Sequence, residues 1–141
     1  MIRFIDYRRG TSFVVVMIII ACLALFLRIA ILQFMSINLA LNESDAQATL
    51  RLISTALENY AKNNNHTFPL HFSLLIETRP PYLDRDYLSL SPLRGYYYSC
   101  PRLEGSSYSC SAIPANCNVT GRMTYTVTTG EVLVSEYCAK K

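Results

Sequence analysis

The feature that most constrains the fold of this chain is a stretch of residues, Thr11–Asn63, without a proline or a glycine. Both residue types destabilise helix interiors, so their absence over such a length predicts one long N-terminal helix. The first part of the stretch is apolar: Phe13–Leu27 carries no charge, Arg28 interrupts it, and Ile29–Met35 resumes it. Counted through Arg28, this apolar segment has 23 residues. At about 1.5 Å per residue, such a helix crosses a hydrocarbon core of about 30 Å.

Charges before the apolar segment predict its orientation in a membrane. Three arginines lie at positions 3, 8 and 9, and positive charges beside a membrane helix favour the cytoplasmic side. We therefore expect a membrane anchor with its N-terminus in the cytoplasm and the rest of the chain on the other side of the membrane. A cleaved secretory signal is the alternative, but large residues crowd the positions around Ala30, where a small-residue cleavage site would lie.

The second part of the predicted helix is amphipathic. Its apolar residues recur at steps of three and four, which places them on one face; they are Ala46, Leu50, Ile53, Leu57 and Tyr60. Asparagines at positions 63–65 predict the end of the helix, because asparagine tolerates the left-handed backbone found there. We expect the apolar face to pack on a sheet formed by the C-terminal residues.

The residues beyond the helix predict a short helical turn and then two β-hairpins. The turn is expected within Pro69–Leu75. Glycines at positions 105 and 130 mark the tight turns of the hairpins, whose strands are expected at Tyr96–Pro101 with Ser107–Ile113 and at Met123–Thr128 with Glu131–Ser135. The predicted fold class is therefore α+β, with the long helix packed on a small antiparallel sheet of about four strands.

Most of the cysteines lie near the C-terminus and predict two disulfides: they are Cys100, Cys110, Cys117 and Cys138. An even number of cysteines downstream of a membrane segment indicates an oxidising compartment. A zinc site is disfavoured, because no C-x-x-C pair and no nearby histidine accompanies them. If the first hairpin turns at Gly105, Cys100 faces Cys110 across the strands, which leaves the other two to pair. The remaining connectivities stay open as alternatives.

Taken in order, these features resemble those of a type IV pilin or pseudopilin. A basic leader, residues 1–10, ends in glycine and precedes the apolar helix. The phrase ATLRLISTALENYA at residues 48–61, followed by Phe68-Pro69, is similar to the later part of the pilin helix. Shorter segments resemble the C-terminal part of pilin-like proteins: PPYL at 80–83, GYY at 95–97 and TYTVTTG at 124–130. The likeness covers nearly the whole chain.

The resemblance implies a route of maturation. A prepilin peptidase would remove the leader after Gly10, and the new terminus, Thr11, would be methylated. Residues 11–35 would then serve as the transmembrane and filament-core helix, and residues 36–141 as an extracytoplasmic pilin-like domain. The implied partners are other pilin or pseudopilin subunits, the peptidase and the inner membrane.

The resemblance also implies a place in the filament. The assembly helix would include Phe13, Val15 and Arg28. Most family members carry a glutamate at the fifth mature position, where this chain has Val15. Some minor pseudopilins lack that glutamate too, so the departure implies a minor or initiating subunit of a type IV pilus or a type II secretion pseudopilus.

Composition and motifs disfavour other classes of function. The formal net charge is +3 without a long basic run, so no nucleic-acid partner is expected. His66 and His71 lack catalytic partners nearby in the sequence, and we expect no enzyme activity, cofactor, metal or small-molecule substrate. A second hypothesis is an anchored adhesive module that does not polymerise, with tyrosines as its binding surface. Strand alternation favours a packing role for them instead; they are Tyr96, Tyr97, Tyr98 and Tyr108.

Overall fold

The computed structural model describes residues 13–139 of the chain. The expected processing site at Gly10 and Thr11 lies outside the described residues. By its internal contacts the chain divides into two units, with the boundary between Ser36 and Ile37. One helix, α1, runs through this boundary, so its two parts belong to different units.

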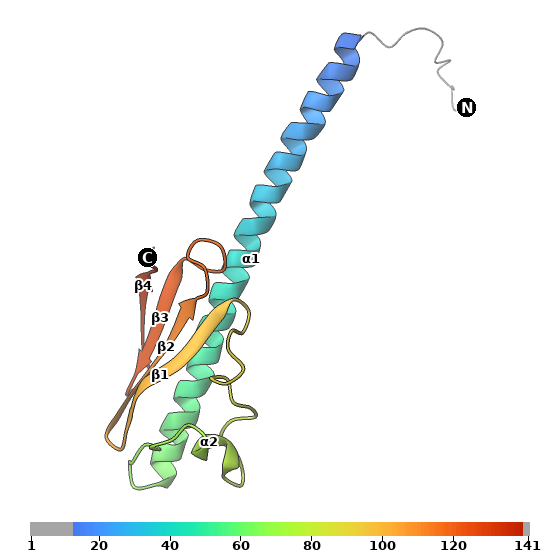
Figure 1. The fold of residues 1–141 in the computed structure, drawn as a ribbon. Helices are drawn as coiled ribbons and strands as arrows, with labels where there is room; N and C mark the ends of the chain where they lie inside the picture. Colours follow the sequence, from blue (N-terminus) through green and yellow to red (C-terminus); the bar gives the residue numbers. More distant parts are fainter. Residues whose placement is uncertain (1–12, 140–141) are drawn as a thin grey trace, which may run out of the picture. The chain divides into compact units, whose positions relative to one another are not determined.

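Helix α1 spans Phe13–Asn63, which is 51 residues (Figure 1). It ends at the first of the three asparagines, as predicted. Beyond it the backbone turns into the left-handed region at Asn65 and His66, with φ of 54° and 59°. The amide N–H of His66 donates to the carbonyl of Ala61 at 2.8 Å, which satisfies one of the carbonyls left free at the helix end.

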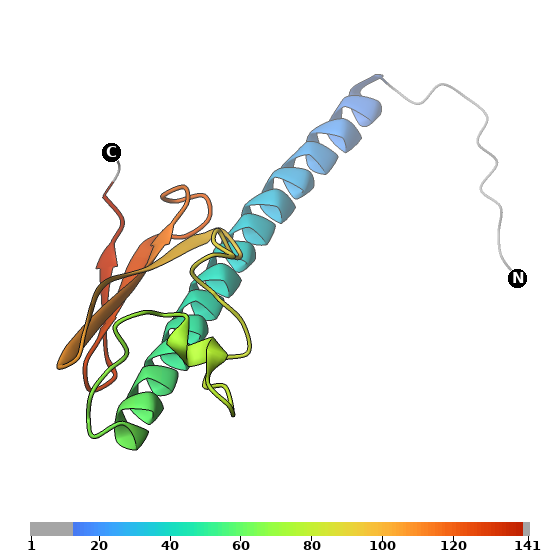
Figure 2. The ribbon, with the colours of Figure 1, turned by 60° about the horizontal axis from the view of Figure 1, so that its bottom comes forward.

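Within the described residues four strands form one antiparallel sheet, in the order β1-β2-β3-β4. Figure 2 shows the sheet on one side of the C-terminal part of α1. The fold class predicted from the sequence, α+β with an antiparallel sheet, is confirmed. The strands are β1 (Tyr96–Glu104), β2 (Ser107–Pro114), β3 (Met123–Thr128) and β4 (Val132–Tyr137).

The segment between α1 and β1 contains a single turn of helix, α2 (Leu74–Glu77), which overlaps the predicted range at Leu74 and Leu75 and continues two residues beyond it. It lies beside the last turns of α1 (Figure 1). Leu75 is fully buried, and its carbonyl accepts the amide N–H groups of Tyr82 and Leu83. The Tyr82 hydroxyl in turn accepts a hydrogen bond from the Asn63 side chain at 2.8 Å. This segment therefore closes the core at the C-terminal end of α1.

The core lies between the sheet and the amphipathic part of α1. The predicted apolar face is buried there: Ala46, Leu50, Ile53 and Leu57 are inaccessible to solvent, and Tyr60 is partly buried. Strand residues alternate, because successive side chains point to opposite faces of a sheet. The side chains that face α1 are buried and mostly aromatic or aliphatic: Tyr96, Tyr98, Tyr108, Cys110, Ala112, Tyr125 and Val127.

The first hairpin differs from the prediction in its register. Strand β1 continues past Pro101 to Glu104, and the pairing shifts by one residue between Ser99 and Arg102. Proline has no N–H to donate, so a strand accommodates it where an extra residue interrupts the ladder of hydrogen bonds. Between the bulge and the turn, the pairing is displaced by one residue, so the turn lies at Gly105 and Ser106. On the side of the bulge away from the turn, the two strands keep the predicted register.

Candidate functional site

The first part of α1 presents an apolar surface on all sides. Every side chain from residue 13 to residue 36 is exposed. Its large apolar side chains range from 40% exposed at Val16 to 76% at Phe13. The helix is long and apolar enough to cross a membrane. Because apolar surface of this extent is unfavourable in water, this part requires lipid or another protein around it.

The assembly residues named from the sequence all lie on this exposed surface. Phe13 and Val15 are in its first turn, where Val15 is 48% exposed. Further along, Cys22, the free cysteine, lines a shallow apolar hollow with Leu25, Phe26 and Ile29. The first part of α1 is thus an exposed apolar helix surface with this one shallow hollow.

Arg28 is the single charged group on this surface. Residues three and four positions away are its neighbours on a helix, and here they are Ala24, Leu25, Ile31 and Leu32. The ion pairs found within residues 13–139 join other arginines to carboxylates and do not include Arg28. The guanidinium therefore has an apolar setting and no counter-ion in the part of the chain that the structure describes.

The packed part of α1 holds the β2–β3 loop through polar side chains. The Asn42 amide donates to the carbonyl of Thr120 at 3.0 Å. One carboxylate oxygen of Glu43 accepts the Arg122 backbone N–H at 2.8 Å, with the Arg122 side chain 3.5 Å away. A further ion pair joins Asp45 to Arg94 at 3.2 Å. The contacts of Asn42 and Glu43 fix the β2–β3 loop against the helix at the start of its packed part, and the pair with Arg94 holds the residues just before β1 there too.

A second polar contact lies deeper, where Tyr108 meets α1. Its hydroxyl donates to Glu58 at 3.1 Å and lies 2.8 Å from the buried Ser54 hydroxyl. Glu58 also accepts the backbone N–H of Gly130 in the β3–β4 turn at 2.8 Å. Burial raises the pKa of Tyr108 to about 12, and the nearby Glu58 charge acts in the same direction. Sequence periodicity did not indicate this network, because Ser54 and Glu58 read as polar flanks of the apolar face.

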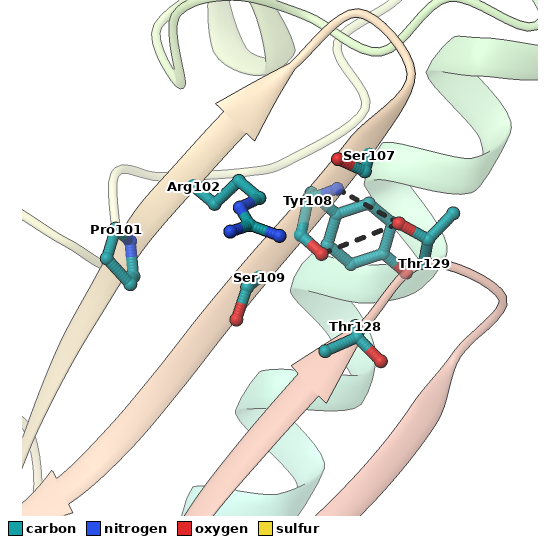
Figure 3. A pocket seen from close by; sticks show the side chains of 7 residues that line it. All are labelled: Pro101, Arg102, Ser107, Tyr108, Ser109, Thr128 and Thr129. Carbon is teal, nitrogen blue, oxygen red and sulfur yellow. Dashed lines mark hydrogen bonds between the residues drawn. The ribbon is translucent and has the colours of Figure 1, made fainter.

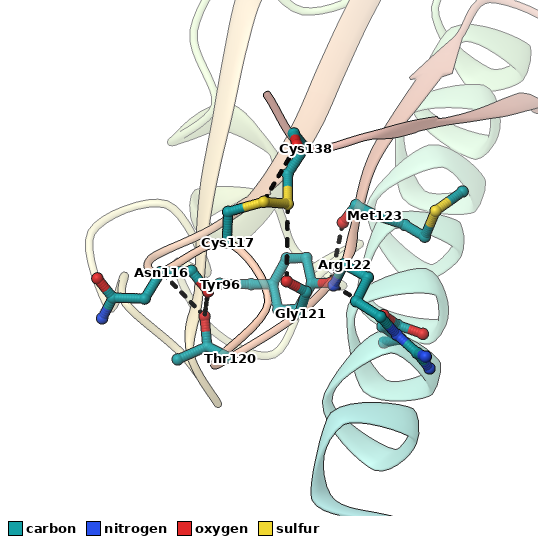
Figure 4. The surroundings of a disulfide bond; sticks show 9 residues. Tyr96, Asn116, Cys117, Thr120, Gly121, Arg122, Met123 and Cys138 are labelled. Carbon is teal, nitrogen blue, oxygen red and sulfur yellow. Dashed lines mark hydrogen bonds and ion pairs between the residues drawn. A yellow bond between two sulfur atoms is a disulfide. The ribbon is translucent and has the colours of Figure 1, made fainter. Parts of the chain in front are cut away.

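The structure pairs the cysteines as expected, Cys100 with Cys110 and Cys117 with Cys138. Figure 4 shows the second disulfide beside Gly121 and the ring of Tyr96. The Tyr96 hydroxyl donates to the carbonyl of Met123 at 2.9 Å. A Cβ atom at Gly121 would collide with the Tyr96 ring, so the close approach of the loop to the core requires glycine there.

The outer face of the sheet is rich in hydroxyl groups. Arg102, Ser109 and Thr128 are opposite one another across β1, β2 and β3. They line a shallow hollow, which Figure 3 shows in close view with Ser107 and Thr129 at its end. The two faces of the sheet therefore differ in chemistry. Aromatic and aliphatic groups face α1, whereas mainly hydroxyl groups of β1 to β3 face solvent, beside Val132 and Val134 of β4.

The tyrosines considered as an adhesive surface are mostly inside the molecule. Tyr96, Tyr98 and Tyr108 are buried, and of the four only Tyr97 is exposed, at 50%. That part of the adhesive hypothesis is wrong, because alternation directs Tyr96 and Tyr98 toward α1. Among residues 13–139 no group of three or more histidine, cysteine and carboxylate side chains is placed to hold a metal ion.

No protein-family model, curated protein or solved structure matches this chain. The architecture is a long N-terminal helix, apolar in its first part, whose amphipathic continuation packs on a small antiparallel sheet. This architecture is compatible with a pilin-like fold.

Proposed function

We propose that this chain is a structural subunit, minor or initiating, of a filament of the type IV pilus or type II secretion pseudopilus kind. The observation that carries the proposal is the division of one helix into a fully exposed apolar part and a packed amphipathic part. A folded domain joined without a break to such a helix is suited to assembly through that helix.

The physical basis of such assembly is that apolar helix surface is stable both in lipid and against other helices. Hydrocarbon tails are as apolar as leucine side chains, so packing and a few polar contacts decide between the two environments. Residues 13–36 offer exposed apolar side chains around the whole helix. The same segment therefore serves first as a membrane anchor and later as the filament core.

The proposal includes a location and partners. The anchor lies in the inner membrane, and the disulfide-bonded domain lies on the oxidising side, because disulfides persist in the periplasm and outside the cell. The partners are a prepilin peptidase and other pilin or pseudopilin subunits. The role is structural and not catalytic. The presence of valine at position 15, where most family members have glutamate, favours a minor or initiating subunit over a major subunit.

N-terminal mass spectrometry of the mature protein tests the proposal. A chain that starts at methylated Thr11 is the expected result. A chain that retains Met1 would instead indicate a permanent anchor, as in the adhesive-module hypothesis, and a start near residue 31 would indicate ordinary secretion. The control is a Gly10→Val variant, in which the Thr11 start should disappear.

The stoichiometry of purified filaments tests the minor or initiating role separately. We expect this chain to be present in small amounts beside another subunit. Filaments that consist mainly of this chain would contradict the assignment to a minor subunit while leaving the filament proposal intact.

A further inference from the structure

Arg28 poses an energetic problem that the rest of the first part of α1 does not. It is the only charged residue between Phe13 and Asn42. A charged side chain within a membrane helix is costly, and such residues in proteins usually face a partner or water. Its neighbours on the helix are apolar, and it has no counter-ion within residues 13–139.

Lipid relieves this cost, whereas helix packing does not. Met35 lies seven positions after Arg28, which is about 10 Å along the helix. The long arginine side chain can extend toward the headgroups over such a distance. When neighbouring helices replace lipid, that route closes, and an unpaired guanidinium becomes a buried charge.

Among residues 13–139, the two carboxylates nearest to Arg28 in the sequence, Glu43 and Asp45, are already engaged. No acidic residue occurs between Asp6 and Glu43. Glu43 accepts the backbone N–H of Arg122, and its side chain is only 14% exposed. Asp45 already pairs with Arg94 at 3.2 Å. A second copy packed in parallel and in register would bring one Arg28 against another, which is repulsive.

We propose that Arg28 pairs with a carboxylate on an apolar helix of a different protein. The inference rests on the proposed function, since it identifies the kind of subunit that packs against this one. The partner carries a single aspartate or glutamate in an otherwise apolar helix, at the depth of Arg28. Ala24 permits close approach beside the ion pair, and Leu25 and Leu32 supply the apolar contact around it.

Association with synthetic helices in phosphatidylcholine vesicles tests the pairing. One peptide is a lysine-flanked leucine–alanine helix with a glutamate at the depth of Arg28, and the matched control has glutamine there. Energy transfer between a fluorophore at the C-terminus of the full chain and one on the peptide reports binding. We expect the glutamate peptide to bind about tenfold more tightly. Arg28→Gln should abolish the preference, and Arg28→Lys should retain much of it.

Two results would overturn the pairing. One is equal binding of the two peptides to the native chain, which is also expected if lipid phosphate is the partner of Arg28. The other is a glutamate preference that survives in Arg28→Gln. The position of the mature N-terminus separates this test from that of the proposed function. A retained Met1 together with a glutamate preference would contradict the filament proposal and support the pairing of Arg28. A Thr11 start together with equal binding would support the filament proposal and contradict the pairing.

Discussion

In α1, the more apolar part is exposed and the more polar part is packed against the sheet. Residues 13–36 are almost entirely apolar, yet every side chain is exposed. The part from Ile37 onward contains more polar residues, yet Leu50, Ile53 and Leu57 are fully buried. Burial therefore follows the presence of a packing partner rather than the apolar content of the segment. The partner of the first part must come from outside this chain, as lipid or as other helices.

Polar side chains show the same contrast. In the packed part, Asn42, Glu43 and Glu58 satisfy backbone groups of the loops that join the strands. In the exposed part, the guanidinium of Arg28 has apolar neighbours only. The packed part of α1 thus uses its polar side chains to position loops. The exposed part has one charged side chain, Arg28, without a polar neighbour on the helix.

The largest expected effect distinguishes a buried leucine from an exposed one on the same helix. Leu50→Ala should lower the free energy of unfolding by about 3 kcal/mol, because it leaves a cavity at a fully buried site. Leu23, which is 57% exposed, is the matched control, and Leu23→Ala should change that free energy by less than about 0.5 kcal/mol. Urea unfolding of the full chain in detergent, followed by near-UV circular dichroism, measures both. Similar losses in the two variants would contradict the contrast.

A smaller effect is expected when the deep polar contact is removed. Tyr108→Phe keeps the ring but deprives the buried Ser54 hydroxyl and Glu58 of a partner. The loss should be about 1–2 kcal/mol in the same unfolding measurement. Tyr97→Phe is the control, since Tyr97 is half exposed, and it should be neutral. If Tyr108→Phe were also neutral, the network would not stabilise the packing of the sheet on α1.

The smallest expected effect is the contribution of the buried tyrosines to the pH dependence of stability. It appears only at alkaline pH. Burial raises the pKa of Tyr96 and raises that of Tyr108 to about 12. Both hydroxyls stay protonated in the folded state while unfolded tyrosines ionise near pH 10, so the unfolded state binds fewer protons there. Stability is therefore fully present below about pH 10 and falls as the pH rises toward 12.

Urea titrations at increasing pH measure this loss, and tyrosinate absorbance reports ionisation in the same samples. Tyr108→Phe should flatten the fall in stability above pH 10, because phenylalanine does not titrate. An equally steep fall in that variant would assign the alkaline loss to other groups.

The helices and strands, and the buried face of α1, could be predicted from the sequence because they depend on local patterns. The asparagines end α1, and steps of three and four identified Leu50 and Ile53 as core residues. The extension of β1 past Pro101 was not predicted, because the bulge depends on pairing with β2. The contact of Glu43 with Arg122 joins residues far apart in the sequence, and no local pattern indicates it. The packing role that strand alternation favoured for the tyrosines is confirmed for Tyr96, Tyr98 and Tyr108, because alternation is itself a local pattern.

The disulfide between Cys117 and Cys138 has a mechanical consequence. Asn42 and Glu43 contact the β2–β3 loop at Thr120 and Arg122, and the disulfide joins this loop covalently to the end of β4. Tension applied along the packed part of α1 is therefore transmitted to the last strand as well as to the loop. The disulfide also closes the open end of the β3–β4 hairpin, so the backbone hydrogen bonds between these strands cannot separate one after another from the end of the chain.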